Sequence, residues 1–533
     1  MQRILIPIKI VFSFSLVAFL YSCNNTEDIA SNKKDSVLVS NRDPSIPGRF
    51  STQTTLKFDS SAVQQFLDSF AAFRAFETDI ISFYRGRKYA YAWFDENGLV
   101  EPANNLYNRI MNIDEEGLPD KIPYKEQFTQ LLETADKPSA MLDLMLTSEY
   151  LSYAKFAWQG IGEKEVKELE WLLPRKKISY TQLLDSLSAN KKTLNQPVYK
   201  QYELLKAELK RMKEIKNSNS LPIIKTDKKK LQEGDSLAVI SDIRSWLFAM
   251  GDLANNNKSN VFDSTLTVAV RSLQKRLGLK DDGIIGTAVI TEMNYPVEKR
   301  IETIMVNMER SRWVPEAIEK DYLLINIPAY KLYVFENDSL AFDMNVVVGK
   351  SQNKTVIFNG DMKYIVMSPY WNVPYSILKN EVLPGIKRNR NYLTRHNMEW
   401  NGNSVRQKPG PNNSLGLVKF LFPNSHSIYL HDTPSKSLFN ETNRAFSHGC
   451  IRLAEPKKLA VYLLRNDPKW TEEAITAAMN AGKEQYVTLT KTIPVFISYF
   501  TAWVGNDGKL NLRKDVYNRD SRLAEMILEK PSI

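Results

Sequence analysis

Cysteine is nearly absent from this chain of 533 residues, since only Cys23 and Cys450 occur. At most one disulfide is therefore possible. Long hydrophobic runs are also lacking, and the apolar run from Ile10 to Leu20 is too short for a comfortable membrane-spanning helix. The chain also has no large excess of charge of one sign. The net charge of +10 is modest for this length, and it suits nucleic acid, acidic lipid or cell-wall polymer without choosing among them.

The first 23 residues have the pattern of an export signal. Arg3 and Lys9 precede the short apolar run, and a small residue, Ser22, stands before Cys23. This pattern resembles a bacterial lipobox, which implies cleavage before Cys23 and lipidation of its thiol. A plain signal peptide or an uncleaved anchor is the alternative. Acyl chains on Cys23 would prevent a disulfide, leave Cys450 as a lone thiol, and hold the protein at the periplasmic side of a membrane in the cell envelope.

The remaining chain is long enough for several domains, and we predict a multidomain α+β protein. A lipoprotein signal peptide (1–22) and a flexible polar tether (23–58) precede a helical scaffold domain (59–235). Apolar residues recur at helical spacing in the scaffold, and its dense aromatic residues are typical of a core. Its end, residues 204–235, is rich in Lys and Glu and reads as a solvated helix or a linker, with no evident nucleic-acid patch.

A small unit of three helices is predicted at 236–298. Asp263 and Ser264 are candidate caps of its second helix, and Gly278 stops that helix. A glycine turn at 281–287 then leads into the third helix. This order resembles the peptidoglycan-binding domain of many wall enzymes, with an unrelated three-helix bundle as the alternative. No sugar-binding residue can be named.

Residues 320–480 change to a β-strand pattern. Short β-prone segments are predicted at 322–327, 331–335, 342–348, 362–367, 418–422 and 427–430, with a helix near 456–464. Residues 375–415 are rich in Asn, Arg, Pro and Gly, and we expect them to form a flap over a cleft. Residues 481–533 continue the β pattern, with a hairpin at 505–508, and are expected to pack on the β-rich domain at 320–480 or on the scaffold domain.

One window, residues 422–453, concentrates reactive side chains. It contains three of the four histidines, His426, His431 and His448, beside Cys450. A neighbouring imidazole can take the proton of a thiol and make it nucleophilic. The N–H groups of Gly449 and Cys450 can face a developing oxyanion. A zinc site and a buried inert cysteine are the rival interpretations, but the spacing of His448 and Cys450 is not a common one for paired ligands.

The segment Ser-His-Gly-Cys-Ile-Arg at 447–452, with a histidine upstream at 431, resembles the signature of the YkuD-type L,D-transpeptidase catalytic domain. Blocks at 326–329, 346–350, 369–374 and 406–411 resemble the YcbB-like branch of that family, as does the order scaffold, peptidoglycan-binding domain, catalytic domain. The resemblance covers nearly everything after residue 60. It implies a thioacyl enzyme on Cys450, release of a terminal D-alanine and formation of a 3→3 peptidoglycan cross-link. It implies no cofactor and no metal.

Site roles follow from the same resemblance. His431 is the candidate base and His448 the alternative, with the carbonyl or the side chain of Asp432 orienting His431. Tyr429 can line the oxyanion site or the cleft wall, and Ser447 can hold the loop. Arg452 is suited to a carboxylate, and Trp371 and Asn372 resemble cleft residues, with a core role for Trp371 as the alternative. The expected partners are peptidoglycan stem peptides and glycan, the membrane, and other cell-wall synthesis proteins.

Two further functions remain open from the sequence. Water as the acceptor would make the enzyme an L,D-carboxypeptidase or an endopeptidase. A non-catalytic lipoprotein that tethers the membrane to peptidoglycan is the third interpretation.

Overall fold

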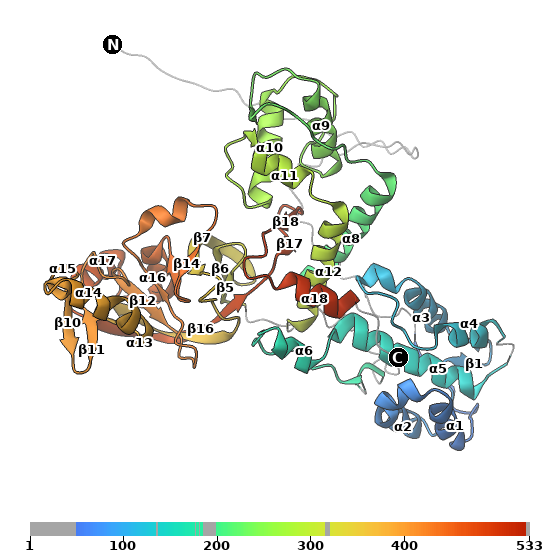
Figure 1. Cartoon of the computed structure of the whole chain (residues 1–533). Coiled ribbons are helices and arrows are strands. Elements are labelled where there is room, and N and C mark those ends of the chain that lie inside the picture. Colours follow the sequence, from blue (N-terminus) through green and yellow to red (C-terminus); the bar gives the residue numbers. More distant parts are fainter. Residues whose placement is uncertain are drawn as a thin grey trace, which may run out of the picture. The chain divides into compact units, whose positions relative to one another are not determined.

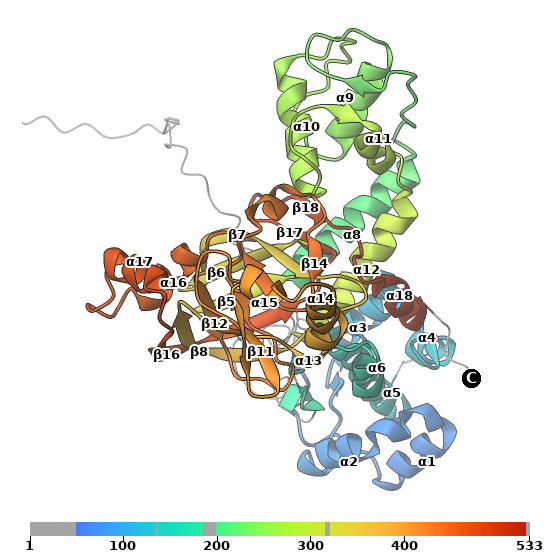
Figure 2. The ribbon, with the colours of Figure 1, turned by 60° about the vertical axis from the view of Figure 1, so that its left-hand side comes forward.

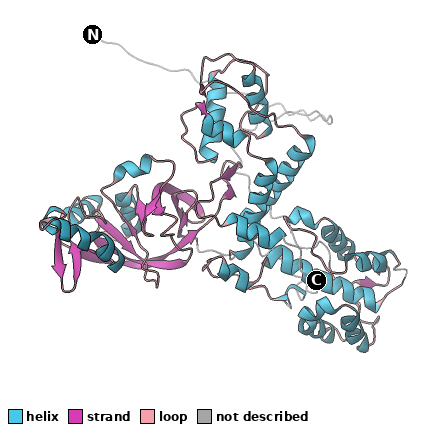
Figure 3. Ribbon diagram, in the orientation of Figure 1, coloured by secondary structure: helices cyan, strands magenta, loops and turns pink. Residues whose placement is uncertain are grey.

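The computed structural model describes residues 49–134, 137–175, 177–180, 182–184, 199–314 and 320–528. The predicted signal segment, the predicted lipidation site Cys23 and most of the tether lie outside these ranges. Across the described ranges, no helix is both long enough and apolar enough to cross a membrane. Helices dominate before residue 314, and strands gather after residue 320, which agrees with the predicted α+β class (Figure 1, Figure 3).

The scaffold region is built around helix α5 (Ala140–Tyr153), which is buried on nearly all sides. The side chain of Asp143 lies inside this helix core, where it accepts hydrogen bonds from the Tyr84 hydroxyl at 2.7 Å and the Trp93 N–H at 2.8 Å. Buried polar groups of this kind must be paired, so the bonds fix the packing of the preceding segments on α5. The surrounding elements are α1 (Ser61–Ser69), η1 (Ala71–Phe76), α2 (Glu77–Gly86), β1 (Phe94–Asp95), β2 (Gly98–Leu99), α3 (Glu101–Met111), η2 (Ile113–Glu116), α4 (Lys125–Glu133), η3 (Ala154–Gln159) and α6 (Glu163–Glu168).

Helix α8 (Gln201–Ser218) differs from the solvated helix or linker predicted at 204–235. It packs against α12 (Val297–Trp313) and buries one stripe of side chains. The Lys and Glu residues that dominate its composition occupy the remaining surface. Its buried stripe consists of Tyr202, Leu205, Leu209, Met212 and Ile215.

The three-helix unit contains α9 (Val239–Ala249), α10 (Ser264–Arg276) and α11 (Thr287–Met293), which lie together in Figures 1 and 2. Two short strands, β3 (Lys230–Leu231) and β4 (Ile285–Gly286), pair beside them. As predicted, Asp263 caps α10, accepting a hydrogen bond from the Leu266 N–H at 2.8 Å. Gly278 follows the helix with φ +67°, a left-handed conformation that glycine adopts at low cost.

The β-rich region forms a nine-stranded sheet in the order β14-β7-β15-β13-β12-β8-β16-β5-β6, and β6 also pairs with β7. This last pairing closes eight strands into a ring, which leaves few free edges. Helices α16 (Pro456–Leu464), as predicted, and α17 (Glu472–Asn480) accompany the sheet. The strands are β5 (Tyr322–Asn326), β6 (Lys331–Glu336), β7 (Ser339–Gly349), β8 (Asn359–Met367), β12 (Val418–Leu421), β13 (Leu430–His431), β14 (Ala445–Ser447), β15 (Ile451–Leu453) and β16 (Gln485–Ser498).

The segment between β8 and β12 contains a small subdomain, here called the flap. Its strands form a sheet in the order β10-β11-β9, and its helices lie beside that sheet (Figure 2). Val373, Leu378, Val382 and Val405 give it a hydrophobic cluster of its own. It therefore packs as a separate piece inserted into the larger sheet. Its elements are β9 (Trp371–Asn372), α13 (Tyr375–Ile377), η4 (Leu378–Val382), α14 (Leu383–Arg388), α15 (Tyr392–Arg395), β10 (Met398–Asn401) and β11 (Ser404–Gln407).

The chain leaves the sheet through a hairpin of β17 (Ala502–Val504) and β18 (Leu510–Leu512). Its turn is closed by a hydrogen bond from the Gly508 N–H to the Gly505 carbonyl at 3.0 Å. The apolar residues of the hairpin belong to the same hydrophobic cluster as the scaffold and three-helix unit, not to the cluster of the large sheet. Helix α18 (Asp520–Leu528) follows.

Candidate active site

Two adjacent parallel strands bring the predicted nucleophile and base together. His431 on β13 is the register partner of Arg452 on β15, and Leu430 is that of Ile451. Cys450 directly precedes β15, where the Ile451 N–H donates to the Tyr429 carbonyl at 3.2 Å. Tyr429 lies beside both groups, since its ring centroid lies 5.7 Å from that of His431 and it acts to lower the pKa of Cys450. The Cys450 Sγ itself donates to the Ser427 carbonyl at 3.7 Å. The thiol, phenol and imidazole are therefore neighbours.

The His431 ring has a fixed orientation. Its Nδ1 atom is hydrogen-bonded to the backbone carbonyl of Asp432. Because a carbonyl only accepts, Nδ1 carries the proton and Nε2 is left as the basic nitrogen. The sequence left open which group of Asp432 orients this ring, and the structure selects the carbonyl.

The side chain of Asp432 serves the loop instead. Its Oδ1 accepts from the Thr433 N–H at 2.7 Å, its Oδ2 accepts from the Leu417 N–H at 2.9 Å, and it pairs with Lys436. This use agrees with the turn-forming role expected for an aspartate in an Asp-Thr-Pro segment.

Both reactive groups are neutral at rest. Burial lowers the pKa of His431 to about 3, and the positive charges of Arg452 and Lys419 act in the same direction. Burial raises the pKa of the Cys450 thiol, although hydrogen bonds from Tyr429 and the charge of Arg452 oppose the shift. At neutral pH the pair is a thiol and an uncharged imidazole, not a thiolate–imidazolium ion pair.

The loop 447–450 is held by hydrogen bonds on two sides. The Ser447 hydroxyl donates to the Cys450 carbonyl and accepts from the Gly449 N–H at 3.0 Å. Gly449 has φ +119°, a conformation that a residue with a side chain adopts only under strain. The Gly449 N–H is thus already engaged, which weighs against its predicted role as an oxyanion donor.

Two residues that the sequence did not indicate support this loop from behind. The buried Thr355 hydroxyl donates to the Gly449 carbonyl at 2.8 Å and accepts from the Gly349 N–H at 2.9 Å. The Tyr517 hydroxyl donates to the Gly349 carbonyl at 2.6 Å and accepts from the Thr355 N–H at 3.1 Å. Neither lies in a recognisable motif, so no sequence signal pointed to them.

The other predicted residues have different surroundings. His448 faces the flap, where its Nε2 lies 3.2 Å from Oε1 of Glu381 on η4. Half-buried Trp371 packs against the flap's own hydrophobic cluster, while Asn372 is exposed. The ring centroid of His426 lies 4.7 Å from that of Phe358. His431, not His448, is thus the histidine that joins the thiol and Tyr429.

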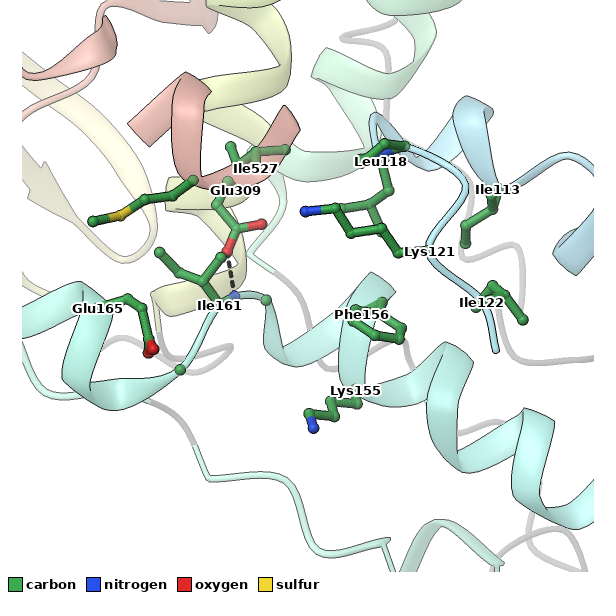
Figure 4. A pocket seen from close by; sticks show the side chains of 14 residues that line it. Ile113, Leu118, Lys121, Ile122, Lys155, Phe156, Ile161, Glu165, Glu309 and Ile527 are labelled. Carbon is green, nitrogen blue, oxygen red and sulfur yellow. Dashed lines mark hydrogen bonds between the residues drawn. The ribbon is translucent and has the colours of Figure 1, made fainter. Parts of the chain in front are cut away.

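A cavity of about 250 Å³ lies elsewhere, where scaffold residues meet α12 and α18 (Figure 4). Figure 4 shows Glu309 in its wall, with its Oε1 accepting from the Ile161 N–H at 2.7 Å. No cysteine, serine or histidine lines it. A large apolar pocket is the usual first candidate for an active site, but this one has no nucleophile, so we place the chemistry at Cys450. The lining residues are Ile113, Leu118, Pro119, Lys121, Ile122, Lys155, Phe156, Gly160, Ile161, Gly162, Glu165, Glu309, Met526 and Ile527.

Comparison with known protein families assigns the three regions of the chain. The family described as "L,D-transpeptidase catalytic domain" matches residues 320–471. Residues 320–471 are therefore similar to an L,D-transpeptidase catalytic domain. The families "Scaffold domain" and "Putative peptidoglycan binding domain" match residues 78–209 and 238–293. The order predicted from the resemblance is thereby confirmed.

Individual proteins are also similar to this chain. A protein of Haemophilus influenzae named "Putative L,D-transpeptidase" is 32% identical over 243 residues, which is 42% of this chain and 49% of the relative. The chain thus matches about half the length of that relative. Crystal structures of L,D-transpeptidases from Stackebrandtia nassauensis and Xylanimonas cellulosilytica are 14% and 12% identical. They cover 52% and 51% of this chain and 96% and 100% of their own, with TM-scores of 0.23 and 0.19. At TM-scores this low, the likeness supports no conclusion about this chain.

Proposed function

We propose that this protein forms 3→3 peptidoglycan cross-links as an L,D-transpeptidase, through a thioacyl enzyme on Cys450. The observation that supports this most is the junction of β13 and β15, where the only described cysteine, Tyr429 and the oriented imidazole of His431 are neighbours. The matched catalytic domain makes peptidoglycan stem peptides the expected substrate.

In the first half-reaction, Cys450 attacks the carbonyl carbon of the third residue of a tetrapeptide stem. Its proton passes to Nε2 of His431 as the sulfur–carbon bond forms. A thiol and an imidazole that are both neutral at rest suit this order of steps, because negative charge on the sulfur develops only when the substrate carbonyl is present to accept it. The carbon–nitrogen bond to the terminal D-alanine then breaks, and the alanine nitrogen leaves with the proton from His431.

In the second half-reaction, the side-chain amine of a diamino acid in another stem attacks the thioester carbon. His431 accepts a proton from that amine, the carbon–sulfur bond breaks, and the proton returns to Cys450. Water in place of the amine would give hydrolysis with the same residues. Ser447, Thr355 and Tyr517 position the nucleophile in this scheme without touching the substrate.

The regions before the catalytic domain would attach the protein to the cell wall and to a membrane. The matched peptidoglycan-binding domain makes the wall polymer the expected partner of residues 238–293. We propose in addition that Cys23 is lipidated and anchors the protein at the periplasmic side of a membrane. This second proposal depends only on the lipobox-like sequence, and mass spectrometry of the N-terminal peptide from membranes tests it.

Purified protein incubated with tetrapeptide-stem muropeptides tests the enzymatic proposal. Cross-linked dimers with release of D-alanine are expected, and Cys450→Ser should form none, because a serine hydroxyl is a far weaker nucleophile here. Tripeptide products without dimers would make the protein a hydrolase. No product at all from well-folded protein would favour a non-catalytic tether.

A further inference from the structure

A row of side chains crosses the sheet beside the proposed nucleophile. Lys419 on β12 is the register partner of both Val366 on β8 and His431 on β13, and His431 is that of Arg452 on β15. Register partners point to the same face of a sheet. The residues next to this row along each strand point to the opposite face of the sheet, where they belong to the hydrophobic core cluster. The row therefore lies on the same face as His431 and the other reactive residues. These core neighbours are Ile365, Phe420, Leu430 and Ile451.

Two positive charges in this row have no counter-ion among the residues that the structure describes. Lys419 and Arg452 are each half-buried, and neither forms an ion pair with another residue in the described ranges. The Nε atom of Arg452 is buried without a hydrogen-bond partner among those residues. Burial lowers the pKa of both groups, which is the direction expected when a charge is poorly compensated. His431 lies between them and is uncharged.

One acid lies near Lys419 without pairing with it. The charge of Glu484 raises the pKa of Lys419, yet Oε1 of Glu484 accepts a hydrogen bond from the Tyr370 N–H at 2.9 Å, and the two side chains form no ion pair. This arrangement places a cation and an anion near each other at one end of the row. Such a combination fits a ligand group that carries both an ammonium and a carboxylate.

Partly burying a cation without a partner costs free energy, so the fold alone gives no reason for Lys419 here. Neighbouring strands are about 4.8 Å apart, so Lys419 and Arg452 are separated by roughly 10 Å at the backbone. A donor stem carries a carboxylate on its terminal alanine. A diamino diacid as its third residue carries another at the far end of its side chain. An extended side chain can separate these two carboxylates by a comparable distance.

We propose that Lys419 and Glu484 recognise the amino-acid end of the third residue's side chain, while Arg452 holds the terminal carboxylate of the donor stem. This assignment rests on the proposed function and specifies its substrate. The protein would then select stems with a diamino diacid over stems whose third residue lacks the free distal carboxylate.

The test uses two donor stems that differ only in that distal carboxylate, free in one and amidated in the other. Wild-type protein should have a lower KM for the free acid. Lys419→Met should raise the KM for the free acid roughly tenfold or more, because it loses a charge-assisted hydrogen bond, and should leave the KM for the amide nearly unchanged. Lys419→Arg should retain most of the preference.

Lys363→Met is the matched control. Lys363 is an exposed lysine on the neighbouring strand β8, so the variant removes the same charge without touching the row. It should keep the wild-type preference and a similar melting temperature.

Three outcomes would overturn the proposal. One is an unchanged preference in an active Lys419→Met variant, which leaves the proposed function standing. Another is a shifted pH profile of kcat with equal effects on both donors, because Lys419 would then act only through His431. The third outcome applies if wild-type protein turns over neither donor, in which case the proposed function itself fails. Recognition of the distal carboxylate is then tested by calorimetry, and equal affinities for the free and amidated stems would overturn it.

Discussion

Replacing Thr355 with valine tests whether the hydroxyl bridge behind the active-site loop sets the position of Cys450. Valine has nearly the same shape, so the change removes two hydrogen bonds while filling the same space. The Gly449 carbonyl and the Gly349 N–H would lose their shared partner at a fully buried site. Leaving each buried group unpaired costs about 1–3 kcal/mol, so we expect the two groups together to cost about 2–6 kcal/mol in folding free energy.

Thr355→Ser is the matched variant, because it keeps the hydroxyl and loses only a methyl group, at a cost of about 1 kcal/mol. The rate of Cys450 acylation by a tetrapeptide stem, followed by intact mass, is the main measurement, with thermal unfolding beside it. A misplacement of the loop by about 1 Å can lower the rate about 100-fold, so valine should slow acylation by one to two orders of magnitude more than serine. Wild-type acylation and unfolding in the valine variant would refute the reasoning.

Three other changes probe the same site. Gly449→Ala should cost about 1–3 kcal/mol in folding free energy through backbone strain alone, because the added Cβ meets nothing closer than the Lys354 carbonyl at 3.8 Å; unchanged unfolding and acylation would contradict this. His448→Ala should reduce turnover far less than His431→Ala, and the reverse order in the muropeptide assay would make His448 the base. The pKa of His431 is lowered to about 3 in the folded protein, against about 6.5 when unfolded, so its contribution to stability is complete above about pH 6.5 and is lost as the pH falls toward 3. On acidification to about pH 4.5, the His431→Gln variant should therefore lose about 2–3 kcal/mol less unfolding free energy than the wild-type protein. Equal losses of stability in the two proteins across this pH range would contradict the prediction.

Local patterns predicted much of the framework. Short β-prone segments indicated the strands that the structure places at β5, β6 and β8, and the expected helix at 456–464 is α16. Asn337 and Asp338, residue types that favour turns, form the turn between β6 and β7, both with positive φ. These features depend on residues close in sequence, which is why the sequence alone was informative.

Long-range packing was not accessible in this way. Tyr517 contacts Gly349 across 168 positions, and nothing in its neighbourhood indicates that contact. In the sequence, Lys419 is an ordinary polar position of a half-exposed strand, and only the register of β12 and β13 places it beside His431. Helix α8 looked solvated because its composition is charged, although five of its residues form a buried stripe.

The flap is a second reason why the surroundings of the site residues could not be predicted from the sequence. Trp371 and Asn372 belong to the small sheet of the flap, so their part in substrate contact depends on where that subdomain lies. The pairing of His448 with Glu381 also depends on it. Sequence motifs identified these residues as a group but could not separate those on the rigid sheet from those on the inserted piece.

Support of the loop by Tyr517 has a consequence for how the protein matures. A nascent chain presents Cys450 to its surroundings well before residue 517 has been synthesised, and until then the Gly349 carbonyl and the Thr355 N–H lack the phenol that joins them. The reactive loop is thus secured late during biosynthesis, so incomplete chains would carry the thiol without the geometry to use it.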